Sequence, residues 1–238
     1  MDNLIHRSTT RQRALLVVCL LVSLIGPPTL AQIGPNGSEA AAFTGLHAAA
    51  HKGDVALIEK LAMSKADVNA RASNGRTPVH VATFARQREA IKALAKAGAN
   101  LNLLENDRYD GVTIASVADD EETLRTLLEL GASAKLTTSR YDGTALIAAA
   151  HLGHDGVVRQ LIRAGAPLDH VNNLHWTAVI ESIVLGDGGK RHQATLKALI
   201  DAGASLQLKD RTGATPLQLA RSRGYGEMVK MLEAAGAK

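Results

Sequence analysis

Short runs of apolar residues at helical spacing alternate with polar turns along most of the chain after residue 43. In residues 144–153, "TALIAAAHLG", and in residues 154–166, "HDGVVRQLIRAGA", the apolar positions recur three or four residues apart, which is typical of short amphipathic helices. A glycine lies at the end of each run, and glycine readily adopts the left-handed conformation that terminates a helix. The pattern predicts a helix, a tight turn and a second helix.

This helix–turn–helix pattern repeats along the sequence. A Gly-Ala dipeptide follows each second helix, with Lys65-Ala66 in the same place in the first repeat. From Lys65 onward the intervals between these dipeptides are 33, 33, 34, 38 and 33 residues. Each repeat is too small to bury its apolar face alone, so the repeats must stack on one another. The predicted repeats begin at about Thr44, Thr77, Thr113, Thr144, Thr177 and Thr215.

The residues that open the repeats resemble a known family. "GRTPVHVAT" (Gly75–Thr83) and "DRTGATPLQLA" (Asp210–Ala220) are similar to the T-P-L-H-x-A start of the ankyrin repeat. The resemblance implies an all-α fold, an ankyrin-repeat solenoid of six helix-turn-helix units joined by β-turn fingers over residues 44–238. The "HWTA" start and "LGDGG" insertion of the fifth repeat resemble exported bacterial ankyrin-repeat proteins.

Two repeats depart from the regular pattern. In the third, we expect Asp119 to cap the second helix, with Glu122 three residues later completing a capping box. The fifth repeat has five extra residues around "GDGGKRH" (residues 186–192), which we interpret as a solvated insertion that widens one face. Its composition is like that of a phosphate-binding loop, but the insertion lies between helices and lacks Ser or Thr after the lysine.

The first thirty-one residues have the pattern of a cleavable secretory signal. Three arginines precede the uncharged run "ALLVVCLLVSLIG", and small residues end the segment. We expect cleavage after Ala31 and a flexible lead over residues 32–43. The alternative is an uncleaved anchor, for which the apolar run is short. The signal predicts secretion across the inner membrane, residence in the periplasm and no membrane attachment after cleavage.

Composition narrows the possible functions. Aromatic residues make up only 3% of the chain, which favours closely stacked small helices over a β-sandwich. The formal net charge is +4, and removing the signal's three arginines and one aspartate leaves 24 basic and 22 acidic residues, about +2. This balance gives little support to nucleic-acid binding. Cys19 lies in the signal, so the mature chain has no disulfide or thiol chemistry.

The histidines raise the question of a metal or catalytic site. The family resemblance implies that His47 and His80 are structural and hydrogen-bond between adjacent turns. His151 and His154 form a His-x-x-His pair, but Gly153 interrupts the helix between them and no third ligand is nearby in sequence. We therefore predict no metal, no cofactor and no catalytic residue, and a protein that is not an enzyme.

The remaining chemistry indicates a binding surface. By position, the resemblance places the partner-binding residues on the finger tips and on the concave side of the first helices. Trp, Tyr and Arg, which dominate the energetics of interfaces, fall at several of these positions. For Trp176 two alternatives stay open: a binding anchor, or a packing residue that covers the fifth repeat. The predicted partner-binding residues are Arg76, Phe84, Arg108, Tyr109, Arg140, Tyr141, His151, Leu152, Asn173, Leu174, His175, Trp176, Leu185, Arg211 and Arg223.

Taken as a whole, the sequence predicts a non-enzymatic protein–protein interaction module that acts in the periplasm through its finger tips and concave face. The expected partner is a protein of unknown identity, not nucleic acid, and we expect a monomer. Two alternatives remain open. One is an accessory factor that protects or assembles a periplasmic enzyme, and the other is an effector secreted to a host.

Overall fold

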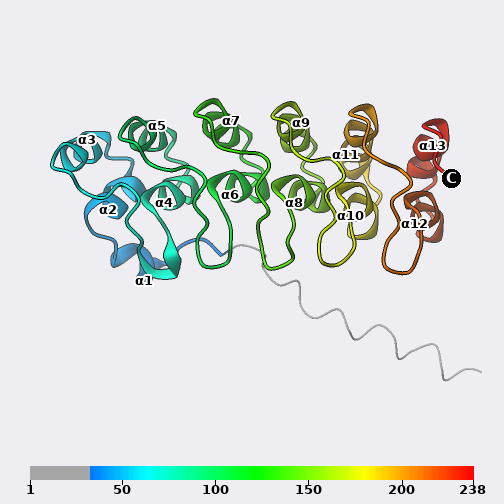
Figure 1. The fold of residues 1–238 in the computed structure, drawn as a ribbon, viewed down its shortest axis with the longest axis horizontal. Coiled ribbons are helices and arrows are strands. Elements are labelled where there is room, and N and C mark those ends of the chain that lie inside the picture. The colour runs from blue at the N-terminus through cyan, green and yellow to red at the C-terminus, as the bar shows by residue number, and fades with distance from the viewer. Residues whose placement is uncertain (1–32) are drawn as a thin grey trace, which may run out of the picture. The chain divides into compact units, whose positions relative to one another are not determined.

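The computed structural model describes residues 33–238, so the predicted signal segment lies outside it. From Gly34 onward the chain forms two parallel rows of helices, with loops projecting from one side (Figure 1). The inner row contains α2 (Gly45–Lys52), α4 (Pro78–Phe84), α6 (Gly111–Val117), α8 (Ala145–Leu152), α10 (Ala178–Val184) and α12 (Pro216–Ser222). The outer row contains α3 (Val55–Met63), α5 (Arg88–Lys96), α7 (Glu121–Glu129), α9 (Asp155–Arg163), α11 (Lys190–Asp201) and α13 (Gly226–Ala234).

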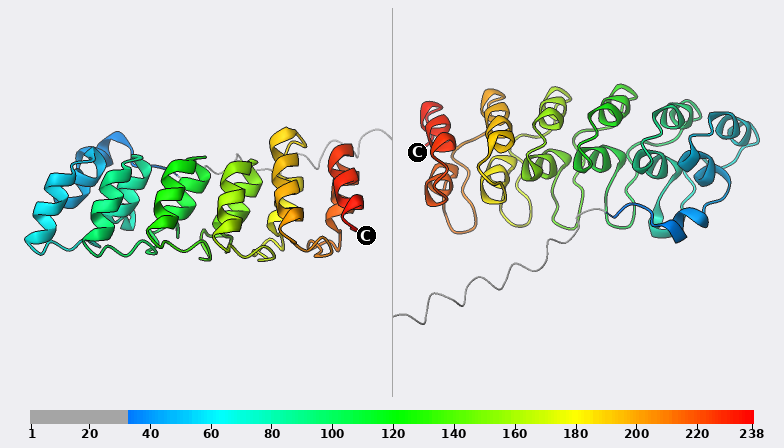
Figure 2. Two further views of the ribbon diagram at one scale, coloured as in Figure 1. Left: turned by 90° about the horizontal axis from the view of Figure 1, so that it is seen from above. Right: turned by 180° about the vertical axis from the view of Figure 1, so that it is seen from behind.

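Each inner helix and the outer helix that follows it form one repeat, and the six repeats lie side by side (Figure 2). The predicted all-α solenoid of six helix-turn-helix units is confirmed. Within residues 33–238 the structure has no strand, and an isolated bridge joins Thr138 to Gly143 in one loop. No helix in this range is both long and apolar enough to cross a membrane.

A threonine is the N-cap residue of every inner helix except α6, as the sequence pattern predicts, and the third repeat brings two corrections. Thr144 and Thr177 accept hydrogen bonds from backbone N–H groups of the first helical turn. In the third repeat, however, Asp110 caps α6, so this helix begins before the predicted Thr113. Asp120 caps α7 in place of Asp119, because Asp119 takes the left-handed conformation, at φ 53°, in the turn immediately before the cap.

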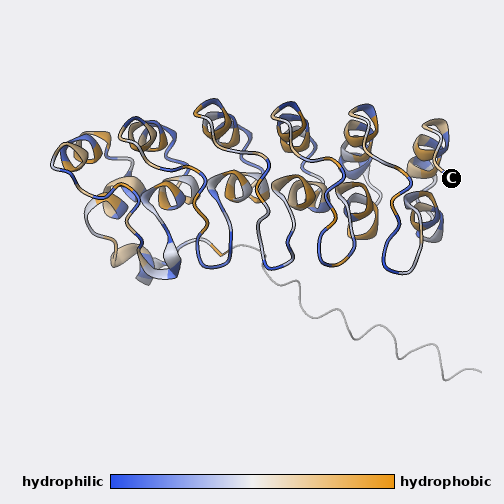
Figure 3. Ribbon diagram, viewed as in Figure 1, coloured by the Kyte–Doolittle hydropathy of each residue, from blue (hydrophilic) through white to orange (hydrophobic). Residues whose placement is uncertain are grey.

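The core is a continuous layer of small and branched apolar side chains between the repeats. Inner helices contribute alanines such as Ala50 and Ala149, which let neighbouring helices approach closely. Outer helices contribute leucines such as Leu127 and Leu161, which are fully buried. Figure 3 shows hydrophobic residues mainly on the helices and hydrophilic residues mainly on the projecting loops. Each repeat therefore covers the apolar face of the next.

Two buried histidines link adjacent repeats, as the resemblance implies. His47 Nε2 donates to the carbonyl oxygen of Arg76 at 2.9 Å, and His80 Nε2 donates to that of Tyr109 at 3.1 Å. His80 Nδ1 accepts the backbone N–H of Thr77 at 3.0 Å and so completes the capping box of α4. Burial lowers the pKa of His80 to about 4, which keeps the ring neutral in this role.

Part of the segment that the sequence predicts to be a flexible lead is helical and packs on the repeats. Residues Gly37–Ala41 form a short helix, α1, capped by the side chain of Asn36, and Phe43 is buried in the core. Glu39 of α1 pairs with Arg76 at 2.6 Å, with side chains 9% and 5% exposed. This buried ion pair ties the segment to the second repeat. No local sequence pattern indicates this ion pair, because Glu39 and Arg76 are 37 residues apart.

Candidate binding surface on the fingers and the palm

The loops that project from the stack form one connected edge. We number them finger 1 to finger 5, at residues 67–77, 100–110, 133–144, 167–177 and 205–215, and we call the finger-facing side of the inner helices the palm. Hydrogen bonds join each finger to the next, so the fingers hold one another in place. These bonds run from Asn106 N to Asn74 O at 2.9 Å, Ser139 N to Arg108 O at 3.0 Å, Asn173 N to Tyr141 O at 3.0 Å and Arg211 Nη2 to Asn173 O at 2.7 Å.

Ion pairs between exposed side chains also connect neighbouring fingers along this edge. Arg108 on finger 2 pairs with Asp142 on finger 3 at 2.7 Å, and Arg140 on finger 3 lies 3.9 Å from Asp107 on finger 2. Such exposed pairs contribute little stability, usually under about 1 kcal/mol. Both arginines were predicted to bind a partner, and both remain exposed beside a carboxylate.

The first finger is covered by the N-terminal segment, which corrects the prediction for Arg76. Its guanidinium lies 2.6 Å from Glu39 and 5.0 Å from the centre of the Phe84 ring, so Arg76 is not an exposed contact residue. A Cβ placed on Gly34 would lie 3.3 Å from the Phe84 ring, so the segment before α1 also approaches this side chain. The palm of the first two repeats is therefore partly occupied by the chain itself.

Tyr109 is the second correction, because it is buried and does not point out from finger 2. Its backbone N–H donates to Glu105 Oε1 at 3.2 Å, and its carbonyl oxygen accepts from His80. These bonds hold residue 109 at the base of the finger against the stack. Burial also raises the pKa of the Tyr109 hydroxyl.

The other predicted residues are at least partly accessible. Large apolar side chains are exposed at Tyr141, Leu152 and Leu185, by 39%, 38% and 41%. Trp176 is partly exposed, with its backbone N–H bonded to Asn172 Oδ1 at 3.0 Å, and its two alternative roles both stay predictions. Of the remaining predicted residues, Asn173, His175, Arg211 and Arg223 are exposed, and Phe84, His151 and Leu174 are partly exposed.

A buried acid that the sequence analysis missed lies on the palm between α8 and α10. Glu181 is on α10 with its side chain 6% exposed, and Oε2 lies 3.5 Å from His151 Nδ1 on α8. Its Oε1 accepts a hydrogen bond from Asn172 Nδ2 of finger 4 at 2.9 Å. Burial raises the pKa of Glu181 to about 7, although the bond from Asn172 opposes this shift.

Comparison with known proteins supports the same architecture. The family model described as ankyrin repeats (3 copies) matches residues 17–105 and 112–210, more than half of the chain. The chain belongs to the ankyrin-repeat family. Ankyrin repeats are protein–protein interaction modules, and proteins of this family are generally binding proteins rather than enzymes.

Several ankyrin relatives are similar over different shares of the chain. The crystal structure of an ankyrin repeat domain from Acinetobacter baumannii AYE is 44% identical, with a TM-score of 0.77, and the match covers 81% of this chain and 98% of that one. The ankyrin repeat protein EF0377 is 30% identical with a TM-score of 0.74, over 82% and 98%. The putative ankyrin repeat protein YahD of Escherichia coli K12 is 41% identical over 100 residues, 42% of this chain and half of YahD's length.

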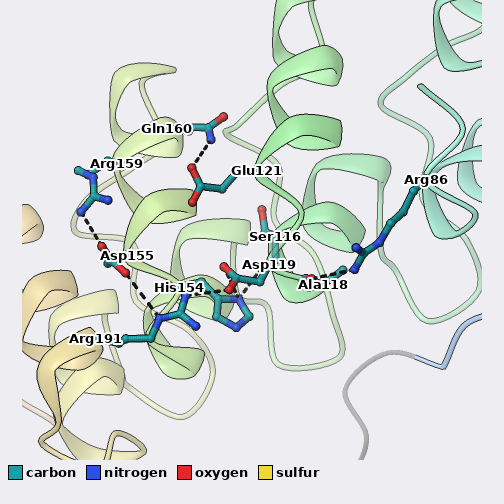
Figure 4. Close-up of polar contacts among 10 residues, drawn as sticks. All are labelled: Arg86, Ser116, Ala118, Asp119, Glu121, His154, Asp155, Arg159, Gln160 and Arg191. Carbon is teal, nitrogen blue, oxygen red and sulfur yellow. Dashed lines mark hydrogen bonds and ion pairs between the residues drawn. The ribbon is translucent and has the colours of Figure 1, made fainter. Parts of the chain in front are cut away.

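One contact extends beyond the nearest-neighbour packing of ankyrin stacks. Arg191, at the start of α11 in the fifth repeat, lies 2.8 Å from Asp119 in the third and 3.6 Å from Asp155 in the fourth (Figure 4). His154 donates from Nδ1 to the carbonyl oxygen of Ser116 at 2.9 Å and lies 3.8 Å from Asp119. Within residues 33–238 no group of three potential ligands could hold a metal ion.

The insertion in the fifth ankyrin repeat is solvated only in part: Asp187, Lys190 and Arg191 are exposed, whereas other residues of the insertion pack on neighbouring repeats. Gly186 is buried, and its carbonyl oxygen accepts from the Tyr225 hydroxyl at 2.8 Å. His192 Nε2 donates to the carbonyl oxygen of His151 at 2.9 Å, and His192 Nδ1 lies 2.8 Å from Asp187. The extra residues therefore fasten α11 to the neighbouring repeats on both sides.

Proposed function

We propose that the chain is a non-enzymatic binding module of the periplasm and that a partner protein docks on the palm and fingers of repeats 3–6. The N-terminal segment already covers part of the palm in repeats 1 and 2, through Gly34 and Glu39. The later repeats lie beyond this segment. Their fingers are fixed by hydrogen bonds from one to the next, so little conformational entropy is lost on binding.

The observation that carries this proposal is the exposure of three large apolar side chains on rigid elements. Tyr141 lies on finger 3, Leu152 ends α8 and Leu185 caps α10, and each exposes about two-fifths of its side chain. Exposed apolar groups at the centre of a polar rim are typical of protein interfaces. A partner that covers them removes this area from water.

Site-specific photocrosslinking tests the docking surface. A photoreactive phenylalanine analogue at Leu152, introduced into the full-length chain in intact cells, should give a discrete cross-linked adduct. The matched control carries the same analogue at Glu129, an exposed residue at the end of outer helix α7. Equal adducts from both positions, or adducts from position 129 alone, would contradict docking on the palm.

The compartment needs its own experiment. Osmotic shock should release the mature chain, and its mass should correspond to an N-terminus at Gln32. A chain that stays in the cytoplasm and keeps Met1 would overturn the periplasmic part of the proposal. The identity of the cross-linked protein would also show whether the partner is a periplasmic enzyme that this chain protects or assembles.

A further inference from the structure

Glu181 occupies a helix position that is apolar in every other repeat. A buried carboxylate costs desolvation free energy that an apolar side chain avoids, so stacking gives no reason for an acid at this position. Counted from the residue that caps each inner helix, the fourth residue in the other repeats is Ala48, Val81, Ile114, Ala148 and Leu219.

Finger 4 carries a residue that is matched to Glu181. Asn172 is buried, and its Oδ1 accepts the backbone N–H groups of Leu174 and Trp176, both at 3.0 Å. Its Nδ2 is thereby directed at Glu181 Oε1, to which it donates at 2.9 Å. Fingers 2 and 5 have carboxylates in this place, Glu105 and Asp210, which accept the same backbone bonds but have no N–H to donate.

The groups around the second carboxylate oxygen of Glu181 do not neutralise its charge. Glu181 Oε2 lies 3.5 Å from His151 Nδ1, and no lysine or arginine among residues 33–238 forms an ion pair with Glu181. Burial and the neighbouring histidines His192 and His154 lower the pKa of His151, which favours its neutral form. The palm thus holds a carboxylate that its own chain fixes in place but does not neutralise.

Two exposed leucines are close in sequence to Glu181 and to its neighbour His151. Leu185 follows Glu181 by four residues and therefore lies one turn further along the same side of α10. Leu152 follows His151 directly at the end of α8, and both leucines expose about two-fifths of their side chains. An acid between apolar groups is complementary to a long cationic side chain, whose methylene groups pack on leucine while its charge reaches the carboxylate.

We propose that Glu181, with Leu152 and Leu185 beside it, forms an anchoring site for a lysine or arginine side chain carried by an extended, otherwise apolar segment of the partner protein. The inference rests on the proposed function and specifies the chemistry of the partner. Asn172 orients the carboxylate, and His151 in its neutral form leaves Oε2 available to the incoming cation. Leu152 and Leu185 contact the apolar residues on either side of it.

The anchoring site should depend on pH in a defined direction. The pKa of Glu181 is raised to about 7, so the carboxylate gains its charge as pH rises from 6 to 8. The titratable groups around it are His151 on α8 and His192 on α11, while Arg221 on α12 is bonded to Glu233 at 2.6 Å. Protonated histidine would compete with the partner's cation, so both effects weaken binding at low pH.

Fluorescence anisotropy with synthetic peptides tests this site on the mature full chain. The probes are labelled leucine-flanked peptides that differ only in a central lysine, arginine or norleucine. We expect the lysine and arginine peptides to bind at least about tenfold more tightly than the norleucine peptide at pH 8, and this ratio should shrink at pH 6. Glu181→Gln, which keeps the size of the side chain, should abolish the ratio, whereas the charge-matched control Glu129→Gln should retain it.

Three results would overturn the anchoring site. They are equal affinity for the lysine and norleucine peptides, a ratio that survives in Glu181→Gln, and failure of all three peptides to bind. The photocrosslinking experiment separates this outcome from failure of the proposed function. The photoreactive analogue at position 152 could still cross-link the partner while Glu181→Gln leaves the adduct unchanged. In that case the docking surface stands and the cation site fails.

Discussion

Arg191 Nη2 lies 2.8 Å from Asp119 Oδ2, although one complete repeat separates the two residues along the stack. Arg191 is the second residue of α11, in the segment of the fifth repeat that carries the insertion around residues 186–192. Asp155 of that fourth repeat lies 3.6 Å from the same guanidinium. Repeats 3, 4 and 5 therefore share one ionic contact, in addition to their apolar packing.

Replacing Arg191 with alanine should lower the free energy of unfolding by about 1 kcal/mol, since its pairs are partly exposed but form a network. Hydrogen exchange should also become faster in α9 and at the start of α7, because α9 and the turn that precedes α7 each lose a contact with Arg191. Lys197→Ala, which removes a pair with Asp201 inside α11, is the control and should leave α7 unchanged. Equal rates of hydrogen exchange in α7 of the two variants would contradict the contact among the three repeats.

Glu39→Gln should destabilise the chain by about 3 kcal/mol, because it removes the carboxylate that forms a buried ion pair with Arg76. Urea denaturation of the mature chain measures this loss. Glu227→Gln removes an acid that pairs with Lys230 on the exposed side of α13, and this control should change stability by no more than about 0.5 kcal/mol. Similar losses in both variants would show that α1 contributes nothing specific.

Because of the buried His80 ring, we expect the free energy of unfolding to fall in acid. Burial lowers its pKa from 6.5 to about 4, so the folded state binds this proton less readily than the unfolded state. The stabilising contribution is complete above pH 6.5 and is lost as pH falls towards 4, by on the order of 3 kcal/mol. His80→Gln should reduce the difference in unfolding free energy between pH 7 and pH 5, whereas exposed His175→Gln should not. An unchanged difference in the first variant would refute this assignment.

For Glu181 we expect the opposite dependence of stability on pH. Its pKa is raised from 4.5 to about 7, so the folded state keeps this proton longer than the unfolded state. Its contribution to stability is therefore greatest below pH 4.5 and is lost as pH rises towards 7. Glu181→Gln should be more stable than the natural chain at pH 8, by about 2 kcal/mol, and nearly equal to it at pH 4.5. Urea denaturation at both pH values measures this, and a variant that is less stable at pH 8 would contradict it.

Much of the fold could be predicted because ankyrin repeats are determined by local patterns. Threonine caps, alanine-rich inner helices and the two structural histidines all lie within one repeat or its neighbour. The burial of Arg76 could not be predicted in this way, because it depends on Glu39 in a segment with no repeat pattern. The error of one residue at Asp119 arose because the turn requires a left-handed residue immediately before the cap.

The palm was predicted as a region, but its chemistry was only partly recognised. Residues selected for aromatic or arginine character included Tyr109, which the second finger holds against the stack. Glu181 was overlooked, although the sequence contains a signal for it. When the six inner helices are aligned on their cap residues, Glu181 is the one acid at a position that is otherwise apolar. Comparison of repeats with each other therefore adds information that composition and motifs do not supply.

The contact between α1 and the second repeat has a practical consequence for the choice of a recombinant boundary. A fragment that starts at Thr44, where the regular pattern begins, would lack Asn36, Glu39 and Phe43. It would expose the ring of Phe84 and the charge of Arg76 at the first finger. The fragment would therefore have a surface prone to association that the natural chain does not have. Expression should therefore begin at or before Gly34.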